Sequence, residues 1–269
     1  MIILRKYTSF FISVILISLI VNFNNAKSDF EDLRLIKECK GFVITKDGIT
    51  QCTPYIVTTT TTKPAAPSTA KADIYLITDV SASVPAKIYA STLTDFLMEF
   101  FNNFKIDPKY VNVAFSPSPG DDNIWYTIPV FNAFYGSTSL QSSINSSYYP
   151  LDGVQSPGQK QLSEIIGMAV NPYFLNTGYS PSYKPHWLIY VTKTSSPDSN
   201  TIAAAQKVRK SGKFKVVIIA YQPTGNIESL LRMSDCFYPA YQPRDLSGLA
   251  TVLAAKIIFD NSIGQDGPC

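Results

Sequence analysis

Several patterns that signal enzyme chemistry are missing from this chain of 269 residues. It has one histidine, His186, and neither a Gly-x-Ser-x-Gly nor a Gly-x-x-x-x-Gly-Lys sequence. A hydrolase needs a nucleophile beside a base, and a nucleotide-binding enzyme of the P-loop type needs the second pattern. We therefore expect no catalytic residues and no enzyme activity, and a hydrolytic enzyme is kept only as an alternative of a different class.

The sequence also lacks an excess of charge and a Cys-x-x-Cys pair. It has 23 Lys and Arg against 20 Asp and Glu, scattered along the chain, so no nucleic-acid surface is expected. With a single histidine and no Cys-x-x-Cys, zinc is disfavoured as the reason for the cysteines.

Long apolar runs are absent except for one near the start. Arg5 and Lys6 precede an apolar run from Phe10 to Val21, and the small residue Ala26 follows. This layout predicts a secretory signal peptide over residues 1–26 and hence a secreted, extracellular protein without a membrane span after cleavage. The alternative is an uncleaved anchor, which would make the chain a membrane-anchored receptor or adhesion protein with a working divalent-metal site.

Four cysteines are present, an even number in a chain expected to reach an oxidising compartment, and this favours two disulfides. Three pairings are possible. Proximity in the sequence favours Cys39 with Cys52, which leaves Cys236 with Cys269.

Composition divides the rest of the chain. Residues 57–71 form a Thr/Pro-rich linker, which is too polar and too rich in proline to pack a core and predicts an extended, O-glycosylated stalk. Residues 27–56 form a short module with the Cys39 to Cys52 loop. Residues 72–262 are long enough for one domain with a large core, and residues 263–269 form a C-terminal tail.

Strand-like runs alternate with helix-length segments in residues 72–262, and the runs at 187–191 and 216–220 are apolar on both faces. This predicts an α/β fold, doubly wound, with a mostly parallel sheet flanked by helices. Strands are expected at 73–78, 110–115, 125–131, 186–192, 214–220 and 237–241, and helices at 85–104, 160–169, 203–210, 227–233 and 246–259.

The candidate binding residues follow the first of these strands. Asp79, Ser81 and Ser83 supply a carboxylate and two hydroxyls, which are the oxygen ligands that Mg²⁺ prefers. In open α/β sheets, ligands bind at the carboxyl ends of strands, where this loop lies. The alternative is that the serines only cap the following helix.

Residues 72–260 resemble the von Willebrand factor A domain family. Three parts carry the resemblance: the Asp79-Val-Ser81-Ala-Ser83 loop, the helix, glycine and strand within residues 203–221, and the sequence of elements from 227 to the final helix that starts at Asp245. The chain combines a small cysteine loop, a threonine-rich stalk and this domain. In this combination it looks most like secreted nematode members of that family. The resemblance implies a Rossmann-like fold with a metal-ion-dependent adhesion site, used to bind an extracellular protein or glycan.

Two departures from the family pattern suggest a degenerate site. The family places a threonine ligand where this chain has Gln155 and Ser156; either could stand in poorly for the threonine, and Ser156 is taken as the candidate binding residue. Where the family has an aspartate after the next strand, this chain has Lys193. Two unit charges about 4 Å apart interact by roughly 4 kcal/mol at an effective dielectric near 20, so a lysine here would repel a divalent ion.

We hypothesise that Lys193 replaces the metal and bridges Asp79 and the serines. No cofactor is then expected beyond weak Mg²⁺ or Mn²⁺ binding. The alternatives are a working but weakened metal site, or a Lys193 that points to solvent.

Two further expectations concern modification and movement. Asn145-Ser-Ser147 is a glycosylation sequon. In integrin-type members of the family the last helix shifts when ligand affinity changes, so a Cys236 to Cys269 disulfide implies a fixed domain.

Overall fold

The computed structural model describes residues 68–120, 129–148, 161–193, 197–224 and 227–269, together with two short strands. These are β1 (Val43–Ile44) and β2 (Thr50–Gln51), which pair antiparallel. The chain divides into two compact units, residues 1–61 and 62–269. Cys39 and Cys52 lie outside the described residues, so their pairing stays a prediction.

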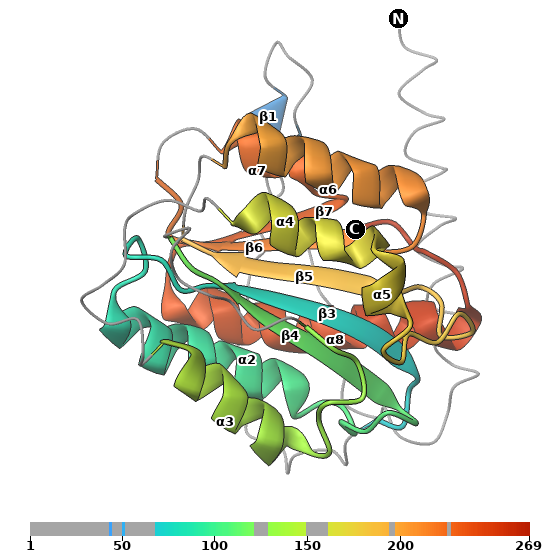
Figure 1. Ribbon diagram of the computed structural model, residues 1–269. Coiled ribbons are helices and arrows are strands. Elements are labelled where there is room, and N and C mark those ends of the chain that lie inside the picture. The colour runs from blue at the N-terminus through green and yellow to red at the C-terminus, as the bar shows by residue number, and fades with distance from the viewer. Residues whose placement is uncertain are drawn as a thin grey trace, which may run out of the picture. The chain divides into compact units, whose positions relative to one another are not determined.

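The second unit is built on a five-stranded sheet in which each neighbouring pair of strands is parallel. The order across the sheet is β4-β3-β5-β6-β7. Because all strands run the same way, their carboxyl ends gather at one edge, on the left in Figure 1, and their amino ends at the other. The strands are β3 (Ala72–Asp79), β4 (Val111–Ser118), β5 (Trp187–Thr192), β6 (Lys215–Tyr221) and β7 (Cys236–Ala240).

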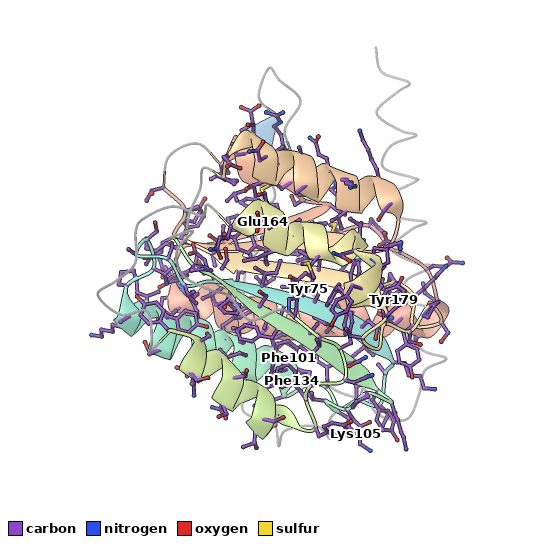
Figure 2. All side chains as sticks on the ribbon, viewed as in Figure 1. Tyr75, Phe101, Lys105, Phe134, Glu164 and Tyr179 are labelled. Carbon is purple, nitrogen blue, oxygen red and sulfur yellow. A yellow bond between two sulfur atoms is a disulfide. The ribbon has the colours of Figure 1, made fainter. Side chains whose placement is uncertain are left out.

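The strands are apolar on both faces because helices cover both. In β3, Ile74 and Leu76 pack into the core on one face, whereas Tyr75 and Ile77 pack into the core on the other. Figure 2 shows Tyr75 on the side of α4 (Leu162–Gly167) and Phe101 on the opposite side. This alternation is the period of two that a pleated strand imposes on its side chains, and it confirms the predicted doubly wound α/β fold.

One face of the sheet is covered by α2 (Thr94–Phe101), α3 (Ser137–Tyr148) and α8 (Pro243–Ile263), as Figure 1 shows. A π-helical segment, Ile88–Leu93, leads into α2. There the Thr94 hydroxyl donates to the carbonyl of Tyr89, five residues earlier, at 2.8 Å. Such π-helical turns are rare and occur often near functional sites, and this one follows the candidate binding loop.

The other face is covered by α4, α5 (Pro172–Leu175), α6 (Ser199–Ser211) and α7 (Glu228–Met233), with a 3₁₀ turn at Met168–Val170 between α4 and α5. Asp198 caps α6 by accepting from the amide of Thr201 at 2.7 Å. Gly212 ends α6 with φ +64°, a conformation that favours glycine. The glycine therefore fixes the turn from α6 into β6.

The sequence missed two helices. The polar helix α3 buries only Leu140 and Ile144, and the short helix α5 buries Phe174, so neither has a strong apolar repeat. The strand expected at 125–131 falls mostly outside the described residues, and its described end, 129–131, is not a strand.

The end of the chain is tied to the sheet. Cys236 at the start of β7 forms a disulfide with Cys269, as predicted, with their Cα atoms 5.4 Å apart. Asn261 in α8 donates to the carbonyls of Tyr183 and Pro185 at 3.1 and 2.9 Å.

Among the described helices, α8 alone has the length and apolar composition of a membrane span. Its apolar face nevertheless packs into the core through Leu246, Ala250, Leu253, Ala254 and Ile257.

Candidate functional site

The candidate site lies at the carboxyl edge of the sheet. Asp79 is the last residue of β3, beside Ser118 at the end of β4. Asp79 and Ser81 are fully buried, and Ser83 is partly exposed. The amide of Val80 donates to the carbonyl of Ser118 at 3.1 Å, which carries the sheet pairing one residue past β3. The loop is therefore fixed at its root by the sheet itself.

The Asp79 carboxylate is held by groups of the protein. Its Oδ1 accepts from the amide of Ser81 at 3.0 Å, and its Oδ2 accepts from the Thr192 hydroxyl at 2.8 Å. The Ser81 hydroxyl in turn accepts from the amide of Ser83 at 3.3 Å. These bonds order the loop through backbone amides, which is how Asp and Ser side chains commonly stabilise a turn before a helix.

The expected bridge between Lys193 and Asp79 is not observed. Lys193 follows β5 directly and is partly buried, but the ion pairs within 4.0 Å among the described residues do not include it. The residue that meets Asp79 from β5 is instead its neighbour Thr192. Alternate residues of a strand point to opposite sides, so two adjacent residues at a strand end do not aim their side chains at the same atom.

The sequence did not single out four residues around this loop. Thr192 holds Asp79, and Ser118 places a buried hydroxyl without a hydrogen-bond partner at the adjacent strand end. Tyr89 in the π-helical segment and Tyr148 at the end of α3 pack beside the loop and form a tyrosine brace that holds it in place. The sequence did contain a signal for Thr192 and Ser118. Both are hydroxyl residues that end apolar strands at the edge of the sheet where ligands bind.

The tyrosine brace connects three elements. Tyr148, at the end of α3, donates to the carbonyl of Val84 at 2.7 Å, and its ring stacks on Tyr89 at 4.9 Å between centroids. The Tyr89 hydroxyl lies 3.2 Å from the hydroxyl of Thr78 and 2.8 Å from that of Ser147. Burial raises the pKa of Tyr89, so its hydroxyl stays protonated and able to donate. The brace therefore holds the loop between β3 and the π-helical turn.

As a metal site, this arrangement is incomplete. Asp79, Ser81 and Ser83 offer the hard oxygen atoms that Mg²⁺ and Mn²⁺ accept. Only one carboxylate is present among them, however, and each of its oxygens already accepts a hydrogen bond. No group of three or more His, Cys, Asp or Glu that could hold a metal ion occurs in the described part of the chain. These residues therefore do not by themselves make a full coordination shell.

Two predicted residues remain untested by this geometry. Ser156 lies outside the described residues, so its place relative to Asp79 stays a prediction. Asn145 lies exposed on α3, and its glycosylation also stays a prediction.

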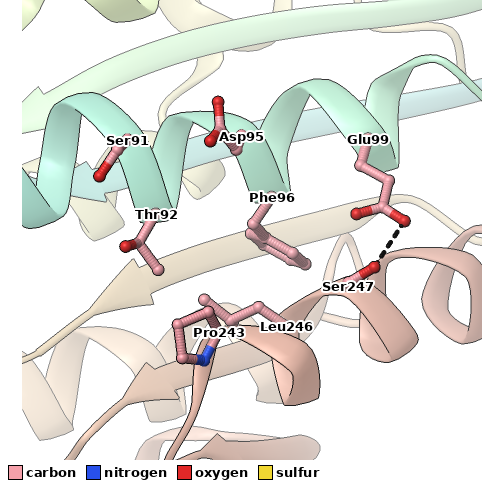
Figure 3. A pocket seen from close by; sticks show the side chains of 8 residues that line it. All are labelled: Ser91, Thr92, Asp95, Phe96, Glu99, Pro243, Leu246 and Ser247. Atoms are coloured by element: carbon pink, nitrogen blue, oxygen red, sulfur yellow. Dashed lines mark hydrogen bonds between the residues drawn. The ribbon is translucent and has the colours of Figure 1, made fainter.

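A separate hollow of about 180 Å³ lies between α2 and α8 (Figure 3). The Ser247 hydroxyl donates to Glu99 Oε1 across it at 2.9 Å. It is lined by Ser91, Thr92, Asp95, Phe96, Glu99, Pro243, Leu246 and Ser247. It includes none of the predicted binding residues.

Comparison with known proteins extends the resemblance noted in the sequence. The family model "von Willebrand factor type A domain" matches residues 73–252. Protein irg-7 of Caenorhabditis elegans is 25% identical over 235 residues, which cover 82% of this chain and 10% of that protein. The chain thus spans about a tenth of the length of this curated relative.

Solved structures agree on the fold. A crystal form of proximal thread matrix protein 1 from the mussel byssus has a TM-score of 0.55 at 18% identity, covering 72% of this chain and 49% of its own. The same mussel protein with a zinc-occupied MIDAS motif has a TM-score of 0.52 at 15% identity, covering 71% of this chain and 46% of its own. At these identities the likeness establishes the architecture.

Proposed function

We propose, from the premise that the chain belongs to the von Willebrand factor type A domain family, that it is a secreted interaction module of the adhesion type. In this proposal the module binds an extracellular protein or glycan through the edge that carries Asp79, Ser81, Ser83 and Lys193. Domains of this family are generally interaction modules without enzyme activity, and the proposal gives this chain no catalytic role.

The observation that carries the proposal is the loop itself. A carboxylate and two hydroxyls stand at the strand ends where an open α/β sheet binds ligands, on a base of five parallel strands. The loop is ordered by hydrogen bonds from Thr192, Ser81 and Ser83, so it is formed before any partner arrives. A preformed loop loses less conformational entropy on binding than a mobile one, which favours a recognition role.

We further propose that this edge works with little or no help from a metal. The mussel relative carries zinc in its MIDAS motif, but this chain places a lysine where a second carboxylate would complete the ligand set. Lys193 directly follows Thr192 at the end of β5, and its positive charge at this edge opposes a divalent cation by charge repulsion. The Asp79 oxygens are meanwhile satisfied by Thr192 and Ser81.

The test is a thermal unfolding series on residues 27–269 with EDTA, Mg²⁺, Mn²⁺ and Ca²⁺, in parallel with the variant Lys193→Asp. A cation at a hundred times its dissociation constant stabilises a folded protein by about 2.7 kcal/mol. For the natural chain we expect the same melting temperature with EDTA and with 1 mM of any of the three cations. We expect a rise in melting temperature with Mg²⁺ or Mn²⁺ for Lys193→Asp, because the substitution removes a positive charge from this edge of the sheet and puts a negative one there.

A matched control is Lys87→Asp, which makes the same charge change at an exposed lysine outside the proposed site. It should leave the metal response unchanged. A clear rise with Mg²⁺ in the natural chain would overturn the metal-poor proposal and favour a working adhesion site. Secretion is checked separately: residue 27 at the amino terminus of exported material supports the signal peptide, and a retained residue 1 supports the membrane-anchored alternative.

A further inference from the structure

The amino edge of the sheet, opposite the candidate site, collects lysines that are far apart in the sequence. Lys109 precedes β4, Lys71 precedes β3, Lys184 precedes β5 and Lys213 precedes β6. Because these strands are parallel neighbours in the order β4-β3-β5-β6, the four lysines follow one another along that edge. With about 4.8 Å between strands, the row extends over roughly 15 Å. We call these four residues the lysine row.

The lysine row has few partners of opposite charge. Lys71, Lys109 and Lys184 are exposed and Lys213 is partly exposed, and the ion pairs among the described residues include none of the four. Lys71 Nζ lies 5.6 Å from the centre of the Tyr183 ring, whose hydroxyl donates to the carbonyl of Lys109.

A cavity of about 310 Å³ opens at one end of the row, beside Lys184 and Lys213. Its two acidic residues are already paired. Asp235 contacts Arg209 at 2.6 Å, and Asp266 contacts Lys215. The two lysines of the row therefore carry the uncompensated charge of this cavity. The cavity is lined by Lys184, Pro185, His186, Arg209, Gly212, Lys213, Phe214, Lys215, Asp235, Gly264 and Asp266.

The residues that line the cavity include one buried imidazole, His186. His186 is 3% exposed, and its Nε2 has no hydrogen-bond partner. Its other nitrogen, Nδ1, lies 3.3 Å from Asp73 Oδ2. Both ring nitrogens are shielded from solvent, so the charge that a ligand meets in this cavity is that of the lysines.

We propose that the lysine row and this cavity bind a linear sulfated polysaccharide, with one sulfate group in the cavity between Lys184 and Lys213. The row offers several ammonium groups along one edge to a chain of anionic sulfate groups, and each ammonium can donate hydrogen bonds to sulfate oxygens. Charge-assisted hydrogen bonds of this kind are stronger than neutral ones.

A polysaccharide suits the site better than a nucleic acid for two reasons. The Cys236 to Cys269 disulfide is typical of an oxidising environment outside the cytosol. Phe214 in the cavity lining is buried and the Tyr183 ring already lies under Lys71, whereas single-stranded nucleic acids are bound through successive stacked aromatic residues. This site is separate from the one in the proposed function.

A simpler role for the lysines is to offset the helix macrodipoles. In this topology the carboxyl ends of α2, α6 and α8 lie at the same edge, and cations are favoured near such ends by roughly 0.3–1 kcal/mol each. That role predicts an effect of the lysines on folding stability and none on ligand affinity. The experiment therefore measures both.

The experiment is a calorimetric titration of residues 27–269 with a heparin octasaccharide at low and at physiological salt. The variant Lys184→Ala/Lys213→Ala is expected to weaken binding about tenfold, since each lost charge contact is worth up to about 1 kcal/mol. Lys184→Arg/Lys213→Arg should keep the affinity. The matched control Lys87→Ala/Arg244→Ala removes two exposed charges at the opposite edge and should also keep it.

Three outcomes would overturn the proposal. The first is unchanged affinity in Lys184→Ala/Lys213→Ala with a lowered melting temperature, which would leave the lysines only the macrodipole role. The second is an equal loss in the control variant, which would mean binding by net charge. The third is equally tight binding of a single-stranded oligonucleotide of the same charge. If the alanine variant does not fold, Lys109→Ala, exposed on its own turn, provides the same test with a smaller expected loss.

Discussion

At the scale of single residues, the polar groups buried at the two edges of the sheet differ in how well they are satisfied. At the carboxyl edge, Asp79 accepts hydrogen bonds from Ser81 and Thr192. At the amino edge, Asp73 is fully buried beside His186, and its Oδ2 accepts from the amide of Ser180 at 2.7 Å. The Asp79 carboxylate orders a loop through these hydrogen bonds. Burial of the Asp73 carboxylate disfavours its charged form.

That cost predicts a dependence of stability on pH. Burial raises the pKa of the Asp73 carboxyl above its ordinary value of 3.8, although His186 and the Ser180 amide oppose the shift. Below pH 3.8 the carboxyl is protonated in both states. As the pH rises, the unfolded chain loses this proton first, so the free energy of unfolding falls until the pH passes the pKa of the folded state.

Asp73→Asn removes this titration and keeps an oxygen for the Ser180 amide. Relative to the natural chain, the variant should therefore gain stability as the pH rises from 4 to 7. Urea unfolding at each pH measures the difference between the two proteins. A difference that stays constant across this range would show that Asp73 does not titrate differently in the two states.

At the scale of elements, α8 is the best-anchored helix at the amino edge. The Trp187 indole donates to Asn261 Oδ1 at 2.9 Å, and Asn261 donates to the carbonyls of Tyr183 and Pro185 at 3.1 and 2.9 Å. The disulfide adds a covalent link from the tail to β7. A shift of α8 along the sheet would have to break these contacts together, which supports our expectation of a fixed domain.

Removing the disulfide tests how much of this anchoring is covalent. Cys269 is exposed, so Cys269→Ala removes the link without opening the core. The closed segment has a sequence separation of 33, for which chain entropy gives a loss of about 3–4 kcal/mol in the free energy of unfolding. Gln265→Ala, also exposed in the tail, should have no effect. Chemical unfolding without reductant compares the two variants, and equal stabilities would mean that the noncovalent contacts suffice.

At the scale of the whole molecule, residues 62–269 contain a complete core of their own. The buried apolar residues on both faces of the sheet run from Ala72 to Ile257. Ser68 still belongs to this unit, because its amide donates to the carbonyl of Asn103 and its carbonyl accepts from Lys105. The unit has the size at which single domains fold by themselves.

We therefore expect residues 62–269 to unfold within about 2 °C of residues 27–269, the range of a small surface change. Differential scanning calorimetry makes the comparison. A markedly lower melting temperature for the shorter chain would mean that the N-terminal part stabilises the domain.

The sequence by itself determined the fold class and the position of the Asp79 loop, and it predicted all five strands of the sheet, together with a sixth at 125–131 whose described end is not a strand. Among three possible disulfide pairings it favoured the one that includes Cys236 with Cys269. It could do so because apolar runs, cysteines and helix caps are local or paired signals. It missed α3 and α5, whose weak apolar patterns leave their formation to contacts with the rest of the fold.

Only the tertiary structure decided which residues from distant parts of the sequence contact one another. It put Thr192, rather than Lys193, against Asp79, because adjacent residues of a strand face opposite ways. It also gathered lysines that look scattered in the sequence into one row, because parallel strands bring their amino ends to the same edge. Such proximities depend on the register and order of strands, which are set by packing between distant segments and not by any single stretch of sequence.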